Sequence, residues 1–226
     1  MKKRVFTVAL VLCMVAIIGF GSLAYFQTGK DLTNYFAVAG IIDPEDPDEI
    51  IDPNDLFSIR LDEINMNTQT GFGDRTEEGN TYTGILPGDT LTKDPTVTNT
   101  GKYDAWVRVK VEVSDFAAWK AACEKHGITD LAAIFNGHDA KAWSRGQADE
   151  VLDTENDTYT FVYYYNDKVA PGGKVTLFQS VTIPAEFDID DMVSLATFQF
   201  KITGEAIQVA NTGNNAKDAF RNFWGK

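Results

Sequence analysis

The chain has 226 residues, of which 44% are hydrophobic and 12% are aromatic, and this composition is typical of a globular protein. Its 20 basic residues are outnumbered by 33 acidic ones, giving a net charge of −13. A nucleic-acid-binding protein needs a basic surface that displaces counterions from phosphates, so this class is not expected. With two cysteines and two histidines, the chain cannot form a disulfide framework or a Cys-rich zinc module.

The first 24 residues have the layout of a secretory signal peptide. A basic head at 2–4 precedes an uncharged run at 5–20, and small residues follow at 21–24. We predict cleavage between Ala24 and Tyr25, so that the protein meets the membrane only through this segment before cleavage. The alternative is an uncleaved anchor, although the uncharged run is shorter than the roughly 20 residues of a membrane span. Cys123 is then the only cysteine of the mature chain.

Two segments precede the main domain. Residues 25–42 are of mixed polarity, and their apolar stretch at 35–39 is compatible with one strand. Residues 43–55, DPEDPDEIIDPND, contain seven carboxylates and three prolines, a composition that predicts an extended, solvated linker. Calcium binding is the alternative, because clustered carboxylates suit hard cations, but the ligand spacing of an EF-hand is absent.

Period-two alternation of apolar and polar residues dominates residues 56–226. Alternating segments occur at 57–62, 105–113, 174–183 and 198–203, and 159–165 is a strongly aromatic strand candidate. Pro87-Gly88 and Pro171-Gly172 are typical of type II turns, in which the second central residue has positive φ. Several strands without a βαβ rhythm predict one all-β domain, an antiparallel β-sandwich.

One helical insertion is expected near residues 115–136. Ser114 is the expected cap, Trp119 and Cys123 share the apolar face, and Gly127 ends the helix. A short second helix is expected at 129–135. Cys123 is predicted to be a small buried residue rather than a nucleophile.

No catalytic, cofactor-binding or metal-binding residues are predicted, and the chain is not expected to be an enzyme. It has no GxSxG, P-loop, HExxH or dinucleotide-binding motif. A zinc site would need His126 and His138 to converge with a carboxylate such as Glu124 or Asp139. A Cys–His pair of Cys123 and His126 is the other alternative, and no orienting third group accompanies it.

Four stretches of the chain resemble the TasA/CalY (camelysin) family. They are GSLAYFQTGKDLTNYFAVAG at 21–40, ILPGDTLTKDPTVTNTGKYDAWVRVKVEV at 85–113, IPAEFDIDDM at 183–192 and EAIQVANTGNNAKDAF at 205–220. The first resembles exported Gram-positive proteins that a SipW-type signal peptidase processes. The second resembles the family's PGD, K and NxG core motif. The last two are similar to the C-terminal part of clostridial relatives.

The resemblance implies a jelly-roll-like β-sandwich that is secreted to the extracellular matrix or cell surface as a subunit of biofilm fibres. In such fibres the N-terminal segment inserts as a donor strand into the next subunit, and residues 25–42 match that segment. The implied partners are copies of the same chain, the signal peptidase during export and other matrix components. Camelysin relatives are also described as metalloproteases, but no catalytic residue matches a position here. A surface metalloprotease and a monomeric, calcium-dependent adhesin remain the alternative functions.

Overall fold

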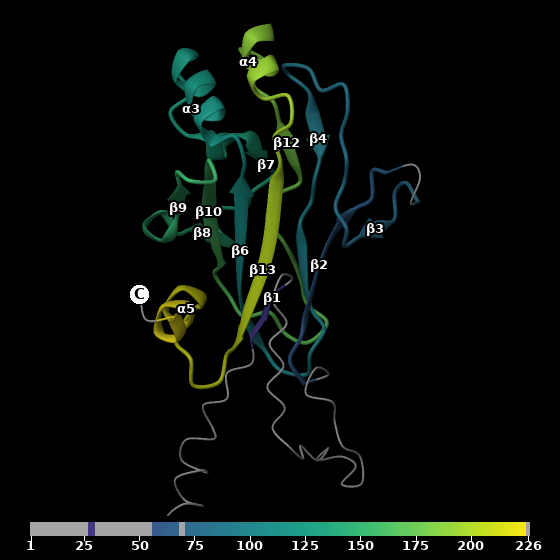
Figure 1. Cartoon of the computed structure of the whole chain (residues 1–226). Helices are drawn as coiled ribbons and strands as arrows, with labels where there is room; N and C mark the ends of the chain where they lie inside the picture. Colours follow the sequence, from purple (N-terminus) through teal and green to yellow (C-terminus); the bar gives the residue numbers. More distant parts are fainter. Residues whose placement is uncertain (1–26, 30–55, 68–70, 225–226) are drawn as a thin grey trace, which may run out of the picture.

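The computed structural model describes residues 27–29, 56–67 and 71–224, and this part of the chain is mostly β, with antiparallel sheets and few helices (Figure 1). The strands are β1 (Gln27–Gly29), β2 (Ile59–Ile64), β3 (Arg75–Thr76), β4 (Thr90–Thr92), β5 (Thr96–Asn99), β6 (Ala105–Val113), β7 (Phe135–Asn136), β8 (Trp143–Arg145), β9 (Val151–Asp153), β10 (Thr158–Tyr165), β11 (Lys174–Thr176), β12 (Ser180–Thr182) and β13 (Phe200–Gln208). The helices are α3 (Phe116–Lys125), α4 (Ile189–Ser194) and α5 (Ala216–Trp224), with 3₁₀ turns η1 (Leu131–Ile134) and η2 (Gln147–Asp149). None of the helices in these described ranges is long and apolar enough to span a membrane.

The strands form three antiparallel sheets. The large sheet has the order β1-β13-β6-β10-β8, with β9 also pairing with β10. The second sheet has the order β11-β5-β2-β3, and the third has the order β4-β12-β7. β6, whose alternation predicted a strand over 105–113, is the central strand of the large sheet and pairs along its whole length with β13.

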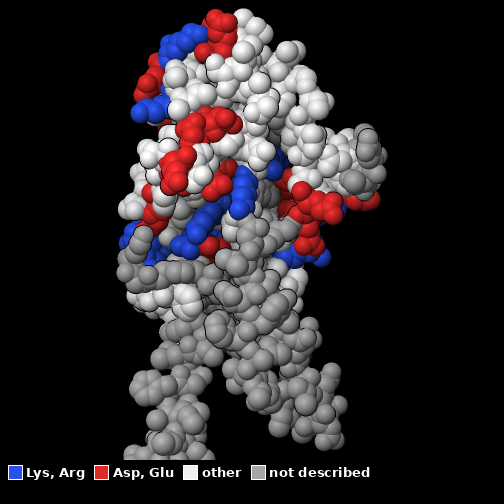
Figure 2. Space-filling model, viewed as in Figure 1, with Lys and Arg blue, Asp and Glu red and all other residues white. Residues whose placement is uncertain are grey.

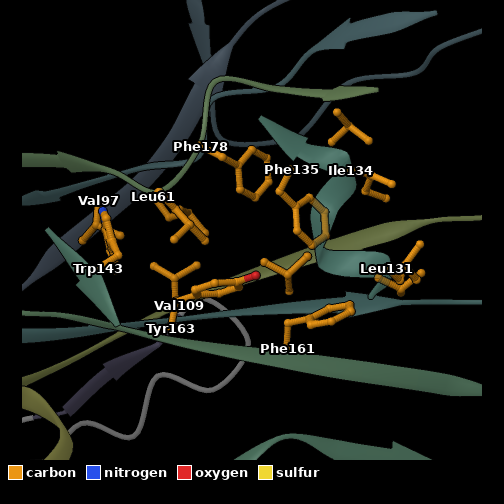
Figure 3. Close-up of a cluster of buried hydrophobic side chains, with 14 of the residues drawn as sticks. Leu61, Val97, Val109, Leu131, Ile134, Phe135, Trp143, Phe161, Tyr163 and Phe178 are labelled. Atoms are coloured by element: carbon orange, nitrogen blue, oxygen red, sulfur yellow. The ribbon is translucent and has the colours of Figure 1, made fainter. Parts of the chain in front are cut away.

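The hydrophobic core lies against the inner face of the large sheet. Val107, Val109, Val111 and Val113 alternate along β6 and are all fully buried. Aromatic and aliphatic side chains from other strands and from η1 pack around them (Figure 3). The alternation of β6 therefore assigns one face to the core and leaves the other for polar groups.

The second sheet approaches the large sheet closely at Gly204 of β13. A Cβ atom at this position would lie 3.3 Å from Cγ2 of Val97 and 3.6 Å from side-chain atoms of Ile59 and Leu61. A larger residue would have to push β2 or β5 away, so a glycine suits this contact.

On the outer face of the large sheet, the cover that the described residues provide is helix α5. The helix packs against this face through a second apolar cluster, which includes Trp106, Tyr164 and Phe220. Away from the helix the face is charged: basic side chains gather over the middle of the sheet with acidic ones on either side (Figure 2). Among them, Arg108 and Lys110 of β6 contact Glu205 of β13 at 2.5 Å and 2.8 Å.

The expectation of a single alternating segment over 174–183 is wrong. β11 pairs with β5 in the second sheet, whereas β12 pairs with β4 and β7 in the third. Between them Leu177 and Phe178 are both buried, which interrupts the alternation. The chain passes from one sheet to another at this point, and the break in period two marks the crossing.

The insertion expected near 115–136 contains α3 and η1, but Ser114 does not cap the helix. The N-cap residue is Asp115, which has a φ of 53° and makes no capping hydrogen bond. The first turn is satisfied from elsewhere: the amide of Phe116 donates to the Asp157 carbonyl, and that of Ala117 donates to the Asp157 carboxylate. Capping by a residue of the β9–β10 turn depends on tertiary structure, so the local sequence could not show it.

Candidate functional site at the open edge of the large sheet

The described part of the N-terminal segment lies at one edge of the large sheet. β1 pairs antiparallel with β13, with Gln27 opposite Ile207 and Gly29 opposite Glu205. β1 has no other strand neighbour among the described residues. The segment that the sequence singled out as a donor strand therefore contributes an edge strand, through backbone pairing, to β13.

Most of this edge of β13 has no strand partner in the described part of the chain. β13 pairs with β6 from Phe200 to Gln208, but β1 covers its other side only from Glu205 to Ile207. The N–H and C=O groups of an uncovered edge can template pairing with another strand. The stretch from Phe200 to Thr203 thus has no strand on this side among the described residues.

A groove runs beside this stretch, and we call it the edge groove. It consists of two adjoining hollows of about 440 and 380 Å³ that share Glu78, Gly79, Lys93, Gln199 and Phe200. One wall is β13 with the residues just before it; the other is formed by β2, β3 and the segment that follows β3. The groove lies along the open edge, so it offers an incoming strand side-chain contacts as well as backbone partners.

The second-sheet wall of the edge groove carries buried charges. Glu63 and Lys93 are 5% and 8% exposed, and Lys93 Nζ lies 2.7 Å from Glu63 Oε2. Nearby, Arg75 bridges the carboxylates of Asp62 and Asp94 at 2.5 Å and 2.7 Å. Buried charges require partners of this kind, because their desolvation is otherwise costly.

The only group of three or more potential metal ligands in the described ranges lies at the end of the molecule where α3 and α4 meet. Its members are His126, Asp188 and Asp191, whose ligand atoms lie within 4.8 Å of one another. His126 Nε2 is 2.8 Å from Asp191, and the Lys125 ammonium contacts Asp188 at 2.6 Å and Asp191 at 3.1 Å. The lysine already supplies the positive charge that two adjacent carboxylates need, so the arrangement acts as a tie between α3 and α4.

His138 does not belong to this group, so the two histidines considered for a zinc site are not brought together there. It packs against Tyr163, with ring centroids 5.3 Å apart. Its Nε2 is buried without a hydrogen-bond partner in the described structure, and burial lowers the pKa of the ring. Glu124 and Asp139, the carboxylates considered with the histidines, are likewise outside the cluster.

Cys123 lies in the core on α3, as predicted, with 4% of its surface exposed. Burial raises the pKa of its thiol to about 11, so the thiol stays protonated at neutral pH. The nearby His126 directs Nε2 to Asp191 instead. The geometry gives no activated Cys–His pair.

Several sequence predictions lie outside the described residues. These are the signal peptide 1–24, the cleavage point between Ala24 and Tyr25, the strand at 35–39 and the acidic segment 43–55 with its calcium alternative.

The sequence did not point to Glu63 or Asn80 as residues of the edge groove. Glu63 is in β2, Asn80 follows β3, and Lys93 follows β4, so three separate segments supply this wall. The only available signal was the position of Lys93 in the PGD, K and NxG motif at 85–113. The partners of that lysine come from tertiary structure and have no spacing pattern.

Comparisons of the chain with protein-family models, with curated proteins and with solved structures found no match.

Proposed function

We propose that this chain is an exported structural subunit that assembles into extracellular biofilm matrix fibres. The N-terminal segment 25–42 of one copy adds as a strand to the edge of β13 in the next copy. The observation that carries this proposal is the pairing of β1 with β13 at an edge that has no further strand between Phe200 and Thr203 in the described part of the chain. Addition of a strand to an open edge combines backbone hydrogen bonds with side-chain contacts in the adjoining groove.

The register of β1 indicates where a longer donor strand would lie. Gln27 faces Ile207 and Gly29 faces Glu205, so an antiparallel strand in the same register places residue 32 opposite Ile202. Residue 34 then lies opposite Phe200, and both Phe200 and Ile202 line the edge groove. An extended strand from 27 to about 35 of the next copy would thus replace the chain's own β1 opposite Glu205 to Ile207 and continue along the part of the edge that β1 leaves uncovered.

A head-to-tail contact of this kind propagates into a filament. The donor segment and the accepting edge are different surfaces of the chain, so each added copy presents a new free edge. We further propose that the antiparallel sheets form a sandwich of the jelly-roll kind. A SipW-type signal peptidase would expose the donor segment by cleavage after Ala24, and other matrix components are further partners.

Electron microscopy of two purified chains tests the proposal. Residues 25–226 should form filaments, whereas residues 43–226 should remain monomeric while keeping the same β-rich circular-dichroism spectrum. Filaments from the shorter chain would refute the donor role, and monomers from both chains would refute self-assembly.

Disulfide trapping tests the register. Leu32→Cys combined with Ile202→Cys should give a ladder of covalent multimers on mild oxidation, whereas Leu32→Cys with Lys201→Cys, one residue out of register, should not. Native Cys123 can stay in place because its thiol is buried. A cross-linked monomer without multimers would show that the strand pairs within its own chain.

A further inference from the structure

A lysine, a glutamate and an asparagine meet on one wall of the edge groove. Glu63 uses both of its carboxylate oxygens: Oε2 lies 2.7 Å from Lys93 Nζ, and Oε1 accepts a hydrogen bond of 2.9 Å from Asn80 Nδ2. Lys93 and Glu63 are both buried, and Asn80 is half-buried. One carboxylate thus holds an amine and a carboxamide side by side.

The amide of Asn80 is fixed in a single orientation. Its Oδ1 accepts a 2.6 Å hydrogen bond from the backbone N–H of Met66, and its Nδ2 also donates to the Ile64 carbonyl at 2.8 Å. The Met66 N–H polarises the amide carbonyl and is placed to stabilise negative charge on Oδ1, as oxyanion-hole donors do. The carbon between these two atoms is the one that a neighbouring amine would attack.

Glu63 is placed to take a proton from the lysine. Its Oε2 lies 2.7 Å from Lys93 Nζ, and both side chains are buried in the groove wall. Transfer of one proton from Nζ to this carboxylate would leave a free amine and a carboxylic acid. The acid can then protonate a leaving group, which is the dual role of a general acid–base catalyst.

We propose that Lys93 and Asn80 become joined by an intramolecular isopeptide bond, with Glu63 as the proton carrier. Nζ of Lys93 attacks Cγ of Asn80, and the new Nζ–Cγ bond forms as negative charge develops on Oδ1. The carbonyl at Oδ1 then re-forms as the Cγ–Nδ2 bond breaks, and Nδ2 leaves as ammonia with the proton that Glu63 carries. Nζ gives its surplus proton to this ammonia, which becomes ammonium. The products are a secondary amide and ammonium, and the glutamate returns to its carboxylate form. The reaction needs no oxidant or cofactor, and the inference does not depend on the proposed function.

The bond would fasten an irregular part of the fold. Residues 77–89, between β3 and β4, contain no helix or strand. A bond from residue 80 to residue 93 would close this segment into a loop and limit its freedom in the unfolded chain. It would also fix Asn80 and Lys93 relative to each other in the wall of the edge groove.

Mass spectrometry of the purified chain of residues 25–226 tests the proposal directly. The intact mass should be lower than the sequence mass by one molecule of ammonia. In a tryptic digest, trypsin should not cleave after the acylated Lys93, so residues 76–102 should appear as one looped peptide that is lighter than its sequence by one ammonia. An intact mass equal to that of the sequence would overturn the proposal and leave Lys93 and Glu63 as a structural ion pair.

Three variants define the mechanism. Lys93→Arg keeps the positive charge and Glu63→Gln keeps the shape, and both should have the full mass of their sequences. Lys110→Arg is the matched control, because Lys110 also contacts a glutamate, Glu205 at 2.8 Å, and should retain the loss of ammonia. Loss of ammonia that persists in Lys93→Arg would overturn the proposal, because it would come from another reaction, such as formation of an asparagine succinimide.

Discussion

The two edges of the large sheet are finished in different ways. Along the β10 edge the chain adds two short strands: β8 pairs with Tyr163 to Tyr165, and β9 pairs with Thr158 to Thr160. Along the β13 edge, among the described residues, only β1 is added, and a groove lies beside the uncovered part. Short edge strands such as β8 and β9 protect a sheet from pairing with another chain. The β13 edge lacks this protection between Phe200 and Thr203 in the described part of the chain, which is why the proposed donor strand is placed there.

Ion pairs strengthen this difference. At the closed edge, Arg145 of β8 contacts Glu150 and Asp130, both at 2.5 Å, and Tyr159 donates to Glu150 at 2.7 Å. These contacts join β8 to the segments around β9 and β10 and fix the two short strands in place. At the open edge, the charges of Glu63 and Lys93 lie in the groove wall instead.

The largest effect is expected from a charge placed on the open edge. Thr203→Lys puts a cation on the uncovered stretch of β13, opposite Lys110 and on the face away from the core, so filaments should be lost while the monomer keeps its circular-dichroism spectrum. Val151→Lys places the same charge on β9 at the closed edge, where the native side chain is 55% exposed, and filaments should form normally. Equal effects of the two substitutions, seen by electron microscopy, would mean that the edges do not differ in function.

A smaller effect is expected when the closed edge loses its cation. Arg145→Ala leaves the nearly buried carboxylate of Glu150 unpaired and should lower the free energy of unfolding by about 3 kcal/mol in urea titrations. Lys120→Ala removes an exposed i,i+4 pair with Glu124 and should change stability by less than about 0.5 kcal/mol. If Arg145→Ala were equally mild, the ion pairs would not be what secures β8 and β9.

The smallest effect concerns acid sensitivity at the α3–α4 end, away from both edges. The Asp188 backbone N–H, together with His126 and Lys125, holds the pKa of Asp191 well below its usual range. The carboxylate therefore contributes stability above about pH 4, the ordinary pKa of an aspartate, and the contribution is lost as the pH falls further.

Urea titrations between about pH 7 and pH 3 measure this contribution. Asp191→Asn should reduce the loss of stability on acidification, whereas the exposed neighbour substitution Asp190→Asn should leave it unchanged. If Asp191→Asn lost as much stability on acidification as the native chain, the contacts of Asp191 with α3 would not contribute to the acid sensitivity.

The regular part of the fold could be predicted from the sequence because its signals are local. The alternation of 105–113 fixes both the extent of β6 and its buried face, and positive φ at Gly88 and Gly172 agrees with the predicted turns. The chain crossing at Leu177 and Phe178 was not predicted, since a short break in an alternating pattern does not show which sheet each half joins.

Helix α5 was missed although it has a local signature. Asn215 accepts a hydrogen bond from the Asp218 backbone, and its amide donates to the Asp218 carboxylate, so the pair acts as a cap. Ala219 and Phe220 then supply the buried face. The groove residues are a different case: Glu63, Asn80 and Lys93 come from three segments, and only the tertiary fold brings them together.

Gly204 lies between the covered and the open parts of the β13 edge. Gly204 has only a hydrogen atom at the position where any other amino acid carries a Cβ, and this allows the close spacing of the two sheets at this point. A methyl group there would act as a wedge between the layers, and the groove that begins two residues away at Ile202 would change its width. Gly204 would lie opposite residue 30 of the proposed donor strand, so one position both pairs with the strand and sets the width of the groove beside it.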